Sequence, residues 1–550
     1  VIGRLALSTT TGHDFNTIDG GGTRRMIGDG SSNDNFPAGN TIGANGFSNS
    51  DNGGTLEILG SGINLNQARE FNNVVVNMTN TTSNVIVLAD YIINGDLTIT
   101  RGTFQINNNI ATANLTIDLF GDMSITSNGN LRTGTANARH EFNFYGDFSN
   151  LGDARFSQRT TQNVGTEANN GIVDANFVSS DQDQQVSANG PTYFYRIEIN
   201  KGVDDTYILF LETNSISNFV LTGPADYNNA GDITTTNDNA FGLIAGTASV
   251  GNNVVINPLN SVGNYSIGSK ARLLVAGGQV AKRGGAAVTP YGTIEVTAGI
   301  FEVPSGSGIT TRGAGQIIVS GGEVWVSQIR TSILGSTAVG GFQQTGGTVN
   351  VWDYSAAESP ITGLAAGTAG NTYARFCLTY EGNTFIMTGG TLNVKNATNT
   401  GLIFINSDPG NINVTGGTVN VFSNVTNESE IASLAPFWDL NIINESTSTS
   451  ARVTSQTLTC GPGGPDNRTI TNPNLRVLNN LTIETSTTRS QTFVGDPQAS
   501  VYGGYLDLCP GNNCVNLIVG GDLTIEDSGV LDVWAWDGTD NDGSATLTFN

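Results

Sequence analysis

One seven-residue phrase returns three times in the middle of the chain and constrains the fold more than any other feature. It reads Thr-Gly-Gly-Thr-Val/Leu-Asn-Val at 345–351, 388–394 and 415–421, with looser copies at 276–280, 297–301 and 320–326. The second small residue of each copy marks the repeat, at Gly278, Gly299, Gly322, Gly347, Gly390 and Gly417, with intervals of 21, 23, 25, 43 and 27 residues. Repeats of this length are typical of solenoids, in which each repeat packs on its neighbours.

Apolar and polar residues alternate on both sides of each marker. Val349 and Val351 follow Gly347 at two and four residues, and these two offsets are also apolar after the markers Gly299, Gly322, Gly390 and Gly417. A period of two is expected of a strand with one buried face. Glycine suits a sharp corner because it enters positive φ without a steric penalty. A phosphate-binding loop would require a helix after the glycines, and no helical pattern follows them.

Strands one repeat apart are therefore expected to lie side by side, about 4.8 Å apart, as parallel sheets. We predict an all-β fold, a right-handed parallel β-helix with coils of roughly 21–27 residues that continues over 61–550. The 43-residue interval predicts an insertion at about 353–384, and 1–60 is either an irregular N-terminal part or a continuation of preceding coils. A composition of 71 Gly and 13% charged residues agrees with this fold.

Charge and hydropathy exclude two classes of partner. The net charge is −24 and no basic stripe is present, which argues against nucleic acid. No apolar run reaches 18 residues, so no membrane span is expected. The sequence starts at Val1 without Met and stops within a strand-like pattern at Asn550. We therefore expect the stack to continue in a longer chain or, as the alternative, by head-to-tail docking of copies into a fibre.

The four cysteines favour disulfides over a metal. Cys509 and Cys514 enclose the turn residues Pro-Gly-Asn-Asn, so a short loop-closing disulfide is predicted. Zinc is the alternative, but the two histidines, His13 and His140, are far from these cysteines in sequence. Sequence alone leaves open whether the remaining two cysteines, at 377 and 460, form a second bridge. Disulfides indicate an oxidising compartment.

A second phrase recurs outside the central repeats. A Gly-Asp dipeptide stands before a segment of alternating apolar and polar residues at four places, where its aspartate is Asp96, Asp122, Asp147 and Asp522. We interpret these aspartates as turn residues that bond their own backbone. The stretch from Phe71 to Phe104 joins Phe-Asn-Asn-Val-Val-Val-Asn to Asn-Gly-Asp-Leu-Thr-Ile and a Gly-Thr-Phe turn.

This sequence pattern resembles that of the large repetitive cell-surface proteins of Bacteroidota that the type IX secretion system exports, among them gliding-motility adhesins. The resemblance implies a secreted, adhesin-like segment that meets secretion or surface-attachment machinery. The carboxy-terminal sorting domain of that family is not visible in the sequence.

Large aromatic residues supply the candidate ligand-binding positions. Trp325 lies three residues after its marker glycine, while Trp352 and Phe422 lie five after theirs, and both offsets point outward. Such rings stack on sugars or meet a partner protein. The structural alternative is that the insertion folds back and covers them. Trp534 and Trp536 share one face of a strand and form either a second platform or packing beneath a loop.

An acidic turn near the end gives the one candidate metal site. Asp537, Asp540 and Asp542 lie in a Gly-rich turn that departs from the EF-hand pattern. Calcium is the functional interpretation of this turn and an Asx-rich turn the structural one. No other cofactor is indicated.

The outward positions on the repeat strands weigh against catalysis. They are Glu302, Trp325, Asn350, Asn393 and Asn420, which predict a polar and aromatic ladder and not a cluster of carboxylates. Sites that cleave acidic polysaccharides need such a cluster together with an Arg or Lys base. We expect an extracellular structural or adhesive element without catalytic activity that binds glycan or a cell-surface partner. The alternatives are a polysaccharide-acting lyase or hydrolase and a passive stalk that carries a distal binding domain.

Overall fold

The computed structural model describes residues 20–28, 53–66, 69–160, 171–223, 240–256, 259, 264–282, 287–303, 308–332, 340–352, 359–361, 375–395, 402–423, 429–444, 453–460, 468–471, 473–485, 505–510, 514–526, 529–533 and 544–549. The chain divides into two compact units, 1–260 and 261–550. Within the described residues the structure is all-β, and helical residues occur only in 3₁₀ turns such as η2 (Pro409–Asn411). The described ladders are parallel with one exception, the pair β39–β40.

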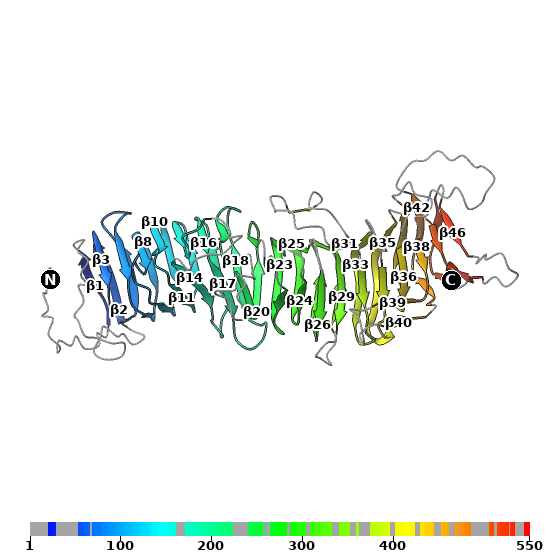
Figure 1. Ribbon diagram of the computed structural model, residues 1–550, viewed down its shortest axis with the longest axis horizontal. Helices are drawn as coiled ribbons and strands as arrows, with labels where there is room; N and C mark the ends of the chain where they lie inside the picture. Colours follow the sequence, from blue (N-terminus) through cyan, green and yellow to red (C-terminus); the bar gives the residue numbers. More distant parts are fainter. Residues whose placement is uncertain are drawn as a thin grey trace. The chain divides into compact units, whose positions relative to one another are not determined.

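In the first unit each full coil contributes a strand to three successive parallel faces (Figure 1). The first face contains β4 (Arg69–Phe71), β7 (Tyr91–Ile93), β9 (Thr116–Leu119), β11 (Arg139–Phe144), β14 (Ile172–Phe177), β17 (Arg196–Asn200) and the start of β20 (Phe241–Val250). The second contains β1 (Gly20–Gly28), β2 (Gly53–Gly60), β5 (Asn73–Asn77), the first halves of β8 (Leu97–Ile106) and β10 (Met123–Thr133), β12 (Phe148–Asn150), β15 (Gln184–Ala188), β18 (Ile208–Glu212) and the end of β20. The third contains β3 (Gly62–Leu65), β6 (Asn84–Val87), the second halves of β8 and β10, β13 (Asp153–Arg155), β16 (Thr192–Phe194) and β19 (Phe219–Leu221); β21 (Val255–Ile256) follows β20.

The second unit repeats this three-sided plan. Its first face contains the first halves of β23 (Lys270–Ala281), β25 (Thr293–Val303), β33 (Thr384–Lys395) and β35 (Ile412–Ser423), with β27 (Gln316–Val319) and β30 (Gly341–Gln344) between them. Its second face contains the second halves of those four strands, β28 (Glu323–Val326), β31 (Thr348–Trp352), β37 (Asp439–Asn444), β42 (Leu481–Thr485) and β45 (Leu523–Ile525).

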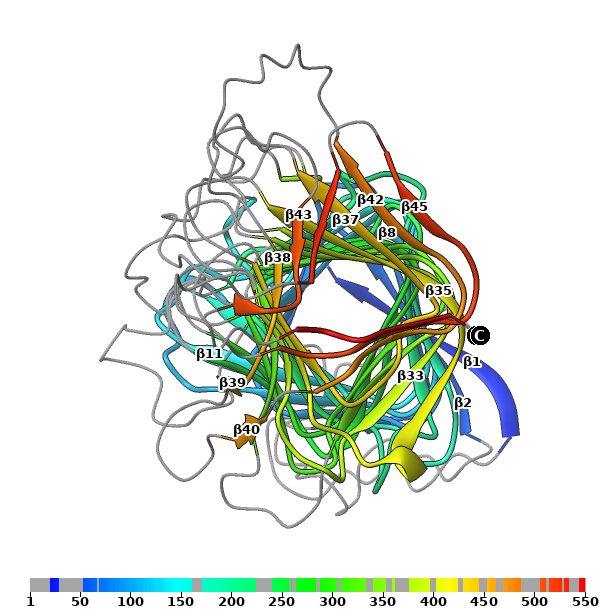
Figure 2. The same ribbon diagram turned by 90° about the vertical axis from the view of Figure 1, so that its right-hand side faces the viewer.

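The third face of the second unit is a ten-stranded sheet. It contains β22 (Tyr265–Ile267), β24 (Val288–Pro290), β26 (Ile309–Arg312), β29 (Gln328–Ser332), β32 (Arg375–Leu378), β34 (Leu402–Ile405), β36 (Ser429–Ser433), β38 (Val453–Ser455), β43 (Tyr505–Asp507) and β46 (Val530–Asp532). A short parallel sheet of β41 (Leu475–Val477), β44 (Leu517–Val519) and β47 (Leu547–Phe549) completes the unit. Figure 2 looks along the strand stack and shows the yellow-to-red strands of this unit enclosing the core.

The repeated glycines turn the chain between the first and second faces of the second unit. Gly299, Gly322, Gly347, Gly390 and Gly417 all have positive φ, between 63° and 88°. A Cβ on Gly347 would lie 2.6 Å from the carbonyl oxygen of Gly321 in the preceding coil, so the corner requires glycine for its close approach as well as its φ. In the first copy the positive φ belongs to Gly277, one residue before the predicted marker.

The valines after each corner form the core, as the alternation predicts. Val324, Val349, Leu392 and Val419 pair in register on successive coils, and each is fully buried. The prediction of parallel strands stacked coil on coil with one apolar face inward is therefore confirmed. The gain in free energy from burying a Val or Leu side chain is about 1.5–3 kcal/mol, and it is available only when a neighbouring coil is present.

Strands are described near both expected domain boundaries. Within the range 353–384, β32 is a strand of the third face, and β33 begins at Thr384. At the other end, β1 and β2 pair in parallel, and β2 pairs with β5.

The Gly-Asp corners work differently from the turn that the sequence predicts. The Oδ1 atom of Asp96 accepts the backbone N–H of Asp122 at 2.9 Å, and Asp122 Oδ1 accepts the N–H of Asp147 at 2.8 Å. The carboxylates thus bond the backbone of the following coil and not their own, which corrects the earlier interpretation. The second unit has the same contact at Asn480, whose Oδ1 accepts the N–H of Asp522 at 3.1 Å. These side chains satisfy corner N–H groups that no ladder reaches.

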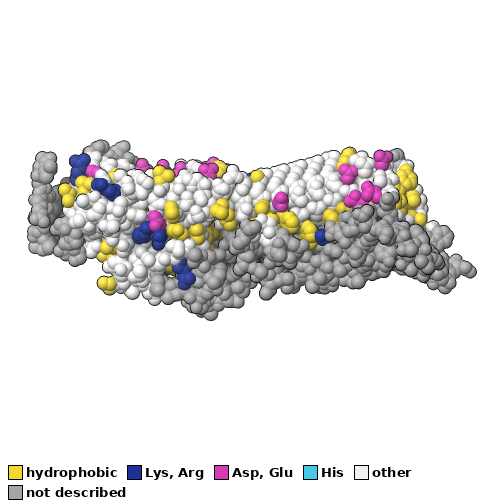
Figure 3. Space-filling model, turned by 90° about the horizontal axis from the view of Figure 1, so that it is seen from above, with side chains coloured by type: hydrophobic (Ala, Val, Ile, Leu, Met, Phe, Trp, Pro, Cys, Tyr) yellow, Lys and Arg dark blue, Asp and Glu magenta, His cyan; other side chains and the backbone are white. Residues whose placement is uncertain are grey.

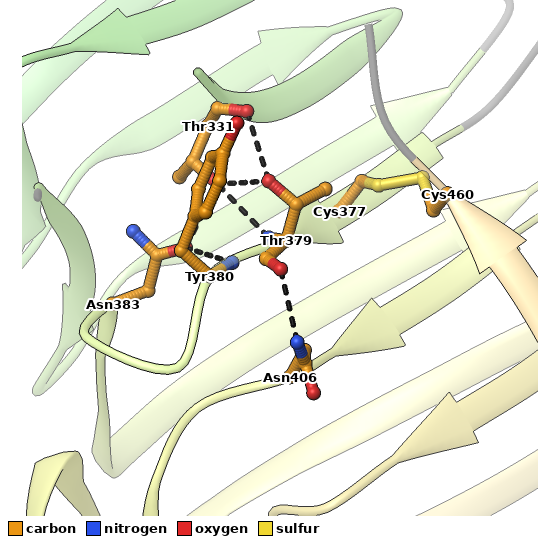
Figure 4. Close-up of a disulfide and its surroundings, with 7 residues drawn as sticks. All are labelled: Thr331, Cys377, Thr379, Tyr380, Asn383, Asn406 and Cys460. Atoms are coloured by element: carbon orange, nitrogen blue, oxygen red, sulfur yellow. Dashed lines mark hydrogen bonds between the residues drawn. A yellow bond between two sulfur atoms is a disulfide. The ribbon is translucent and has the colours of Figure 1, made fainter. Parts of the chain in front are cut away.

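A disulfide-linked hairpin covers the outside of the third face in the second unit. β39 (Leu458–Cys460) and β40 (Arg468–Ile470) form the hairpin, and a disulfide joins Cys460 to Cys377 of β32 (Figure 4). The hairpin and the sheet bury one apolar cluster, made of Cys377, Leu402, Phe404, Ala432, Leu458, Cys460 and Ile470. Cys509 and Cys514 form the other disulfide, the pairing that their spacing predicts.

Candidate functional site

Three aromatic residues and one lysine lie together on the outer surface of the second face of the second unit. We call Trp325, Trp352, Lys395 and Phe422 the aromatic strip. Trp352, Lys395 and Phe422 occupy the same register position on three consecutive coils, because β31, β33 and β35 pair strand by strand. Trp325 comes from the preceding coil, on β28. All four side chains are half-buried, so part of each ring or chain faces solvent.

The rings of the aromatic strip are held in fixed geometry. The centroids of Trp325 and Trp352 are 5.8 Å apart at an interplanar angle of 18°. The Nζ atom of Lys395 lies 3.8 Å from the Trp352 centroid and 5.8 Å from the Phe422 centroid, both within cation–π range. Glu323 Oε2 accepts the Trp325 indole N–H at 2.7 Å. Each ring therefore has a partner that fixes its orientation.

An asparagine ladder runs beside the aromatic strip. The amide nitrogen of each residue donates to the amide oxygen one coil earlier, with 2.8 Å from Asn393 to Asn350, 2.8 Å from Asn420 to Asn393 and 2.9 Å from Asn441 to Asn420. The predicted polar and aromatic ladder is thus present. Because the amides hydrogen-bond one another, this column forms a rigid polar surface beside the rings.

Part of the interruption after Trp352 returns to the same face. Ser359 Oγ donates to Glu302 Oε1 at 2.6 Å, and both Glu302 and Ile361 are buried. Glu302 is the register neighbour of Trp325. The segment 359–361 therefore covers the sheet beside Trp325, while the aromatic strip stays half-exposed. Figure 3 shows one face of the molecule with its charged and hydrophobic side chains.

The structure brings together three of the five predicted aromatic positions. The other two, Trp534 and Trp536, lie outside the described residues, as do the candidate calcium ligands Asp537, Asp540 and Asp542. Sequence reasoning missed Lys395. The sequence does contain a signal for this residue. Lys395 stands five residues after Gly390, and Trp352 and Phe422 stand at the same distance from their own marker glycines. In the part of the chain that the structure describes, no group of three or more His, Cys, Asp or Glu side chains is arranged to hold a metal.

His140 in the first unit is buried, and its contacts indicate a structural role. Its Nδ1 accepts the backbone N–H of Leu115 at 3.0 Å, and its Nε2 lies 3.3 Å from the side-chain nitrogen of Asn107. Burial lowers the pKa of His140 from 6.5 to about 4. The imidazole is therefore neutral at physiological pH.

His140 predicts an acid-sensitive first unit. Below pH 6.5 the unfolded chain takes up a proton at this histidine, whereas the folded chain stays neutral down to about pH 4. Stability present above pH 6.5 is thus lost as the pH falls through this window, by about 3 kcal/mol in total. Urea unfolding at several pH values would measure it, with His140→Gln as the comparison. If the unfolding free energy changes equally with pH between pH 5 and 6.5 in both proteins, His140 does not have the lowered pKa described above.

Comparisons of the chain with protein-family models, with curated proteins and with solved structures find no match. Among the residues that the structure describes, no helix has the length and apolar character needed to span a membrane.

Proposed function

We propose that this chain is an extracellular structural and adhesive element whose aromatic strip binds glycans. The observation that carries the proposal is the stacked, half-exposed pair Trp325–Trp352, extended by Lys395 and Phe422 on the next two coils. The solvent-facing parts of aromatic rings held at a fixed spacing can pack against the apolar C–H groups of successive sugar rings. The asparagine ladder beside them supplies amide groups to meet sugar hydroxyls.

The rigidity of the support favours binding. The strip stands on paired strands whose inward residues, such as Val351 and Val394, are buried. A ligand would therefore not have to order the rings, which lowers the entropic cost of association. A surface of scattered exposed aromatics would not have this advantage.

The finer parts of the proposal concern handedness and setting. We propose that the coils wind right-handedly and that the chain works outside the cell, as do the surface proteins that the sequence resembles. Two disulfides support an oxidising setting, because such bonds persist in extracellular compartments and are rare in the cytosol. Peptide mapping of protein recovered from its natural source would test the location directly, since free thiols at Cys509 and Cys514 would contradict it.

The strip predicts a specific loss of glycan binding. Trp352→Ala removes the ring that contacts both Trp325 and Lys395, so we expect at least about a ten-fold weaker affinity for any glycan that the native protein retains on an array. Phe120→Ala is the matched control, because Phe120 is also an exposed stacked aromatic, paired with Tyr145 in the first unit at 4.3 Å.

The results separate the alternatives. Array binding that Trp352→Ala abolishes and Phe120→Ala leaves unchanged supports the adhesive element. No binding by the native protein supports a passive stalk. Binding that survives Trp352→Ala contradicts the placement of the site on the strip.

A further inference from the structure

The third face of the first unit carries two arginines on adjacent coils. Arg132 of β10 follows Leu131, and Arg155 of β13 follows Ala154, the register partner of Leu131. Like charges on neighbouring strands repel each other. The next coil places Tyr193 of β16 beside Arg155. The outward column therefore reads arginine, arginine, tyrosine over three coils.

One carboxylate holds the two arginines together. Asp153 Oδ2 accepts from Arg132 Nη2 at 2.8 Å and from Arg155 Nη2 at 3.0 Å, and its Oδ1 accepts from Arg155 Nε at 3.1 Å. Two guanidinium groups sharing one carboxylate leave a net charge of about +1 on the three side chains. These side chains are 28%, 33% and 25% exposed for Arg132, Arg155 and Asp153, so the charge reaches solvent.

An aromatic ring adjoins the cationic group. The guanidinium carbon of Arg155 lies 5.3 Å from the centroid of Tyr193, within cation–π range. Tyr193 is half-buried, and it fixes the plane of the guanidinium. A positively charged cluster of this kind contrasts with a chain whose net charge is −24.

We propose that Arg132, Arg155 and Tyr193 form a binding site for the carboxylate of an acidic sugar, in a uronate-containing glycan. Asp153 engages Nε and Nη2 of Arg155, which leaves the N–H groups of Nη1 to donate to a ligand carboxylate, and an adjacent ring can stack on the sugar that bears it. Asp153 holds the arginines in place and at the same time competes with the ligand for their charge. This site belongs to the first unit and is independent of the aromatic strip.

Because Asp153 both holds the arginines and competes with the ligand, its substitution and those of the arginines should change the affinity in opposite directions. The probe is tetragalacturonate, titrated into the full chain by calorimetry at low salt. Arg155→Gln and Arg132→Gln should each weaken binding about ten-fold or more, because each removes a charge-assisted hydrogen bond to the ligand. Asp153→Asn should tighten binding about two- to five-fold, because it raises the local charge. Arg25→Gln is the control, since Arg25 also pairs with a carboxylate in the first unit, that of Glu57 at 2.7 Å.

Each outcome decides the proposal. Losses in both arginine variants, a gain in Asp153→Asn and no change in Arg25→Gln support it. An affinity for the methyl-esterified tetramer or for sulfated dextran equal to that for tetragalacturonate overturns the assignment to carboxylate sugars. If Asp153→Asn weakens binding while its melting temperature is unchanged, Asp153 does not compete with the ligand for the arginines, and the proposed arrangement of the site is overturned. An arginine variant that fails to fold is replaced by Tyr193→Ala, for which undiminished binding contradicts the site.

Discussion

Replacing Val349 by aspartate is expected to lower the unfolding free energy of the second unit by more than about 4 kcal/mol. Val349 is fully buried between its register partners Val324 and Leu392. The substitution removes apolar contacts and places a charge where those neighbours offer no hydrogen bond. Because each coil is stabilised by the coils on either side, the damage should spread beyond β31. Urea unfolding followed by the fluorescence of Trp325 and Trp352 would report on these same coils.

The matched control is Thr348→Asp. Thr348 precedes Val349 on the same strand, and its side chain is half-buried on the outer surface. The same charge is added there without entering the core, so the change should stay within about 1 kcal/mol. Similar midpoints for the two variants would show that the assignment of inward and outward residues is incorrect.

Removing the Cys377–Cys460 disulfide should destabilise the second unit more than removing the Cys509–Cys514 disulfide. The first bridge spans 83 residues and the second spans 5, so the loop-entropy relation gives about 4.5 and about 2 kcal/mol. The long bridge also holds the β39–β40 hairpin on Leu402 and Phe404. Without it, the hairpin keeps the burial of the apolar cluster and the contact of the Arg468 guanidinium with the Tyr380 ring, 5.0 Å from its centroid.

Paired alanine variants test this order. We expect the Cys377→Ala/Cys460→Ala protein to unfold at a clearly lower urea concentration than Cys509→Ala/Cys514→Ala. Limited proteolysis should also cut the former near the hairpin before the rest of the unit opens. If both variants unfold at the same midpoint and resist protease equally, the bridge adds nothing to what packing already supplies.

Two of the three faces of the second unit follow from the sequence because they repeat. Glycine at the corner and valine two residues later recur, since every coil must turn at the same place and pack on the same core. The strands of the third face share no repeated sequence motif. In β34 all four residues are buried, because the core lies on one side of the strand and, at Leu402 and Phe404, the hairpin lies on the other. A strand covered on both faces loses the period-two pattern that identifies strands.

The sequence predicted candidate site residues only where they lie at a fixed offset from the repeated glycines. Trp325, Trp352 and Phe422 were found by their offsets from glycine, and Lys395 has the same offset but was overlooked because it is not aromatic. The arginine pair shows a weaker signal of the same kind. Arg132 stands three residues after Gly129, and Arg155 stands three after Gly152. Their shared contact with Asp153 depends on coil alignment in a region without the central phrase, so sequence alone did not place them together.

The long disulfide also has a mechanical consequence. When the chain is pulled from both sides of the bridge, the force passes directly from Cys377 to Cys460, and the residues between them carry no load. The sequence separation of 83 between the two cysteines corresponds to about 270–300 Å of contour length, at about 3.3–3.6 Å per residue. That length stays stored while the sulfurs are joined and is released when they are reduced. The extensibility of this stretch under tension is therefore set by the redox state of its surroundings.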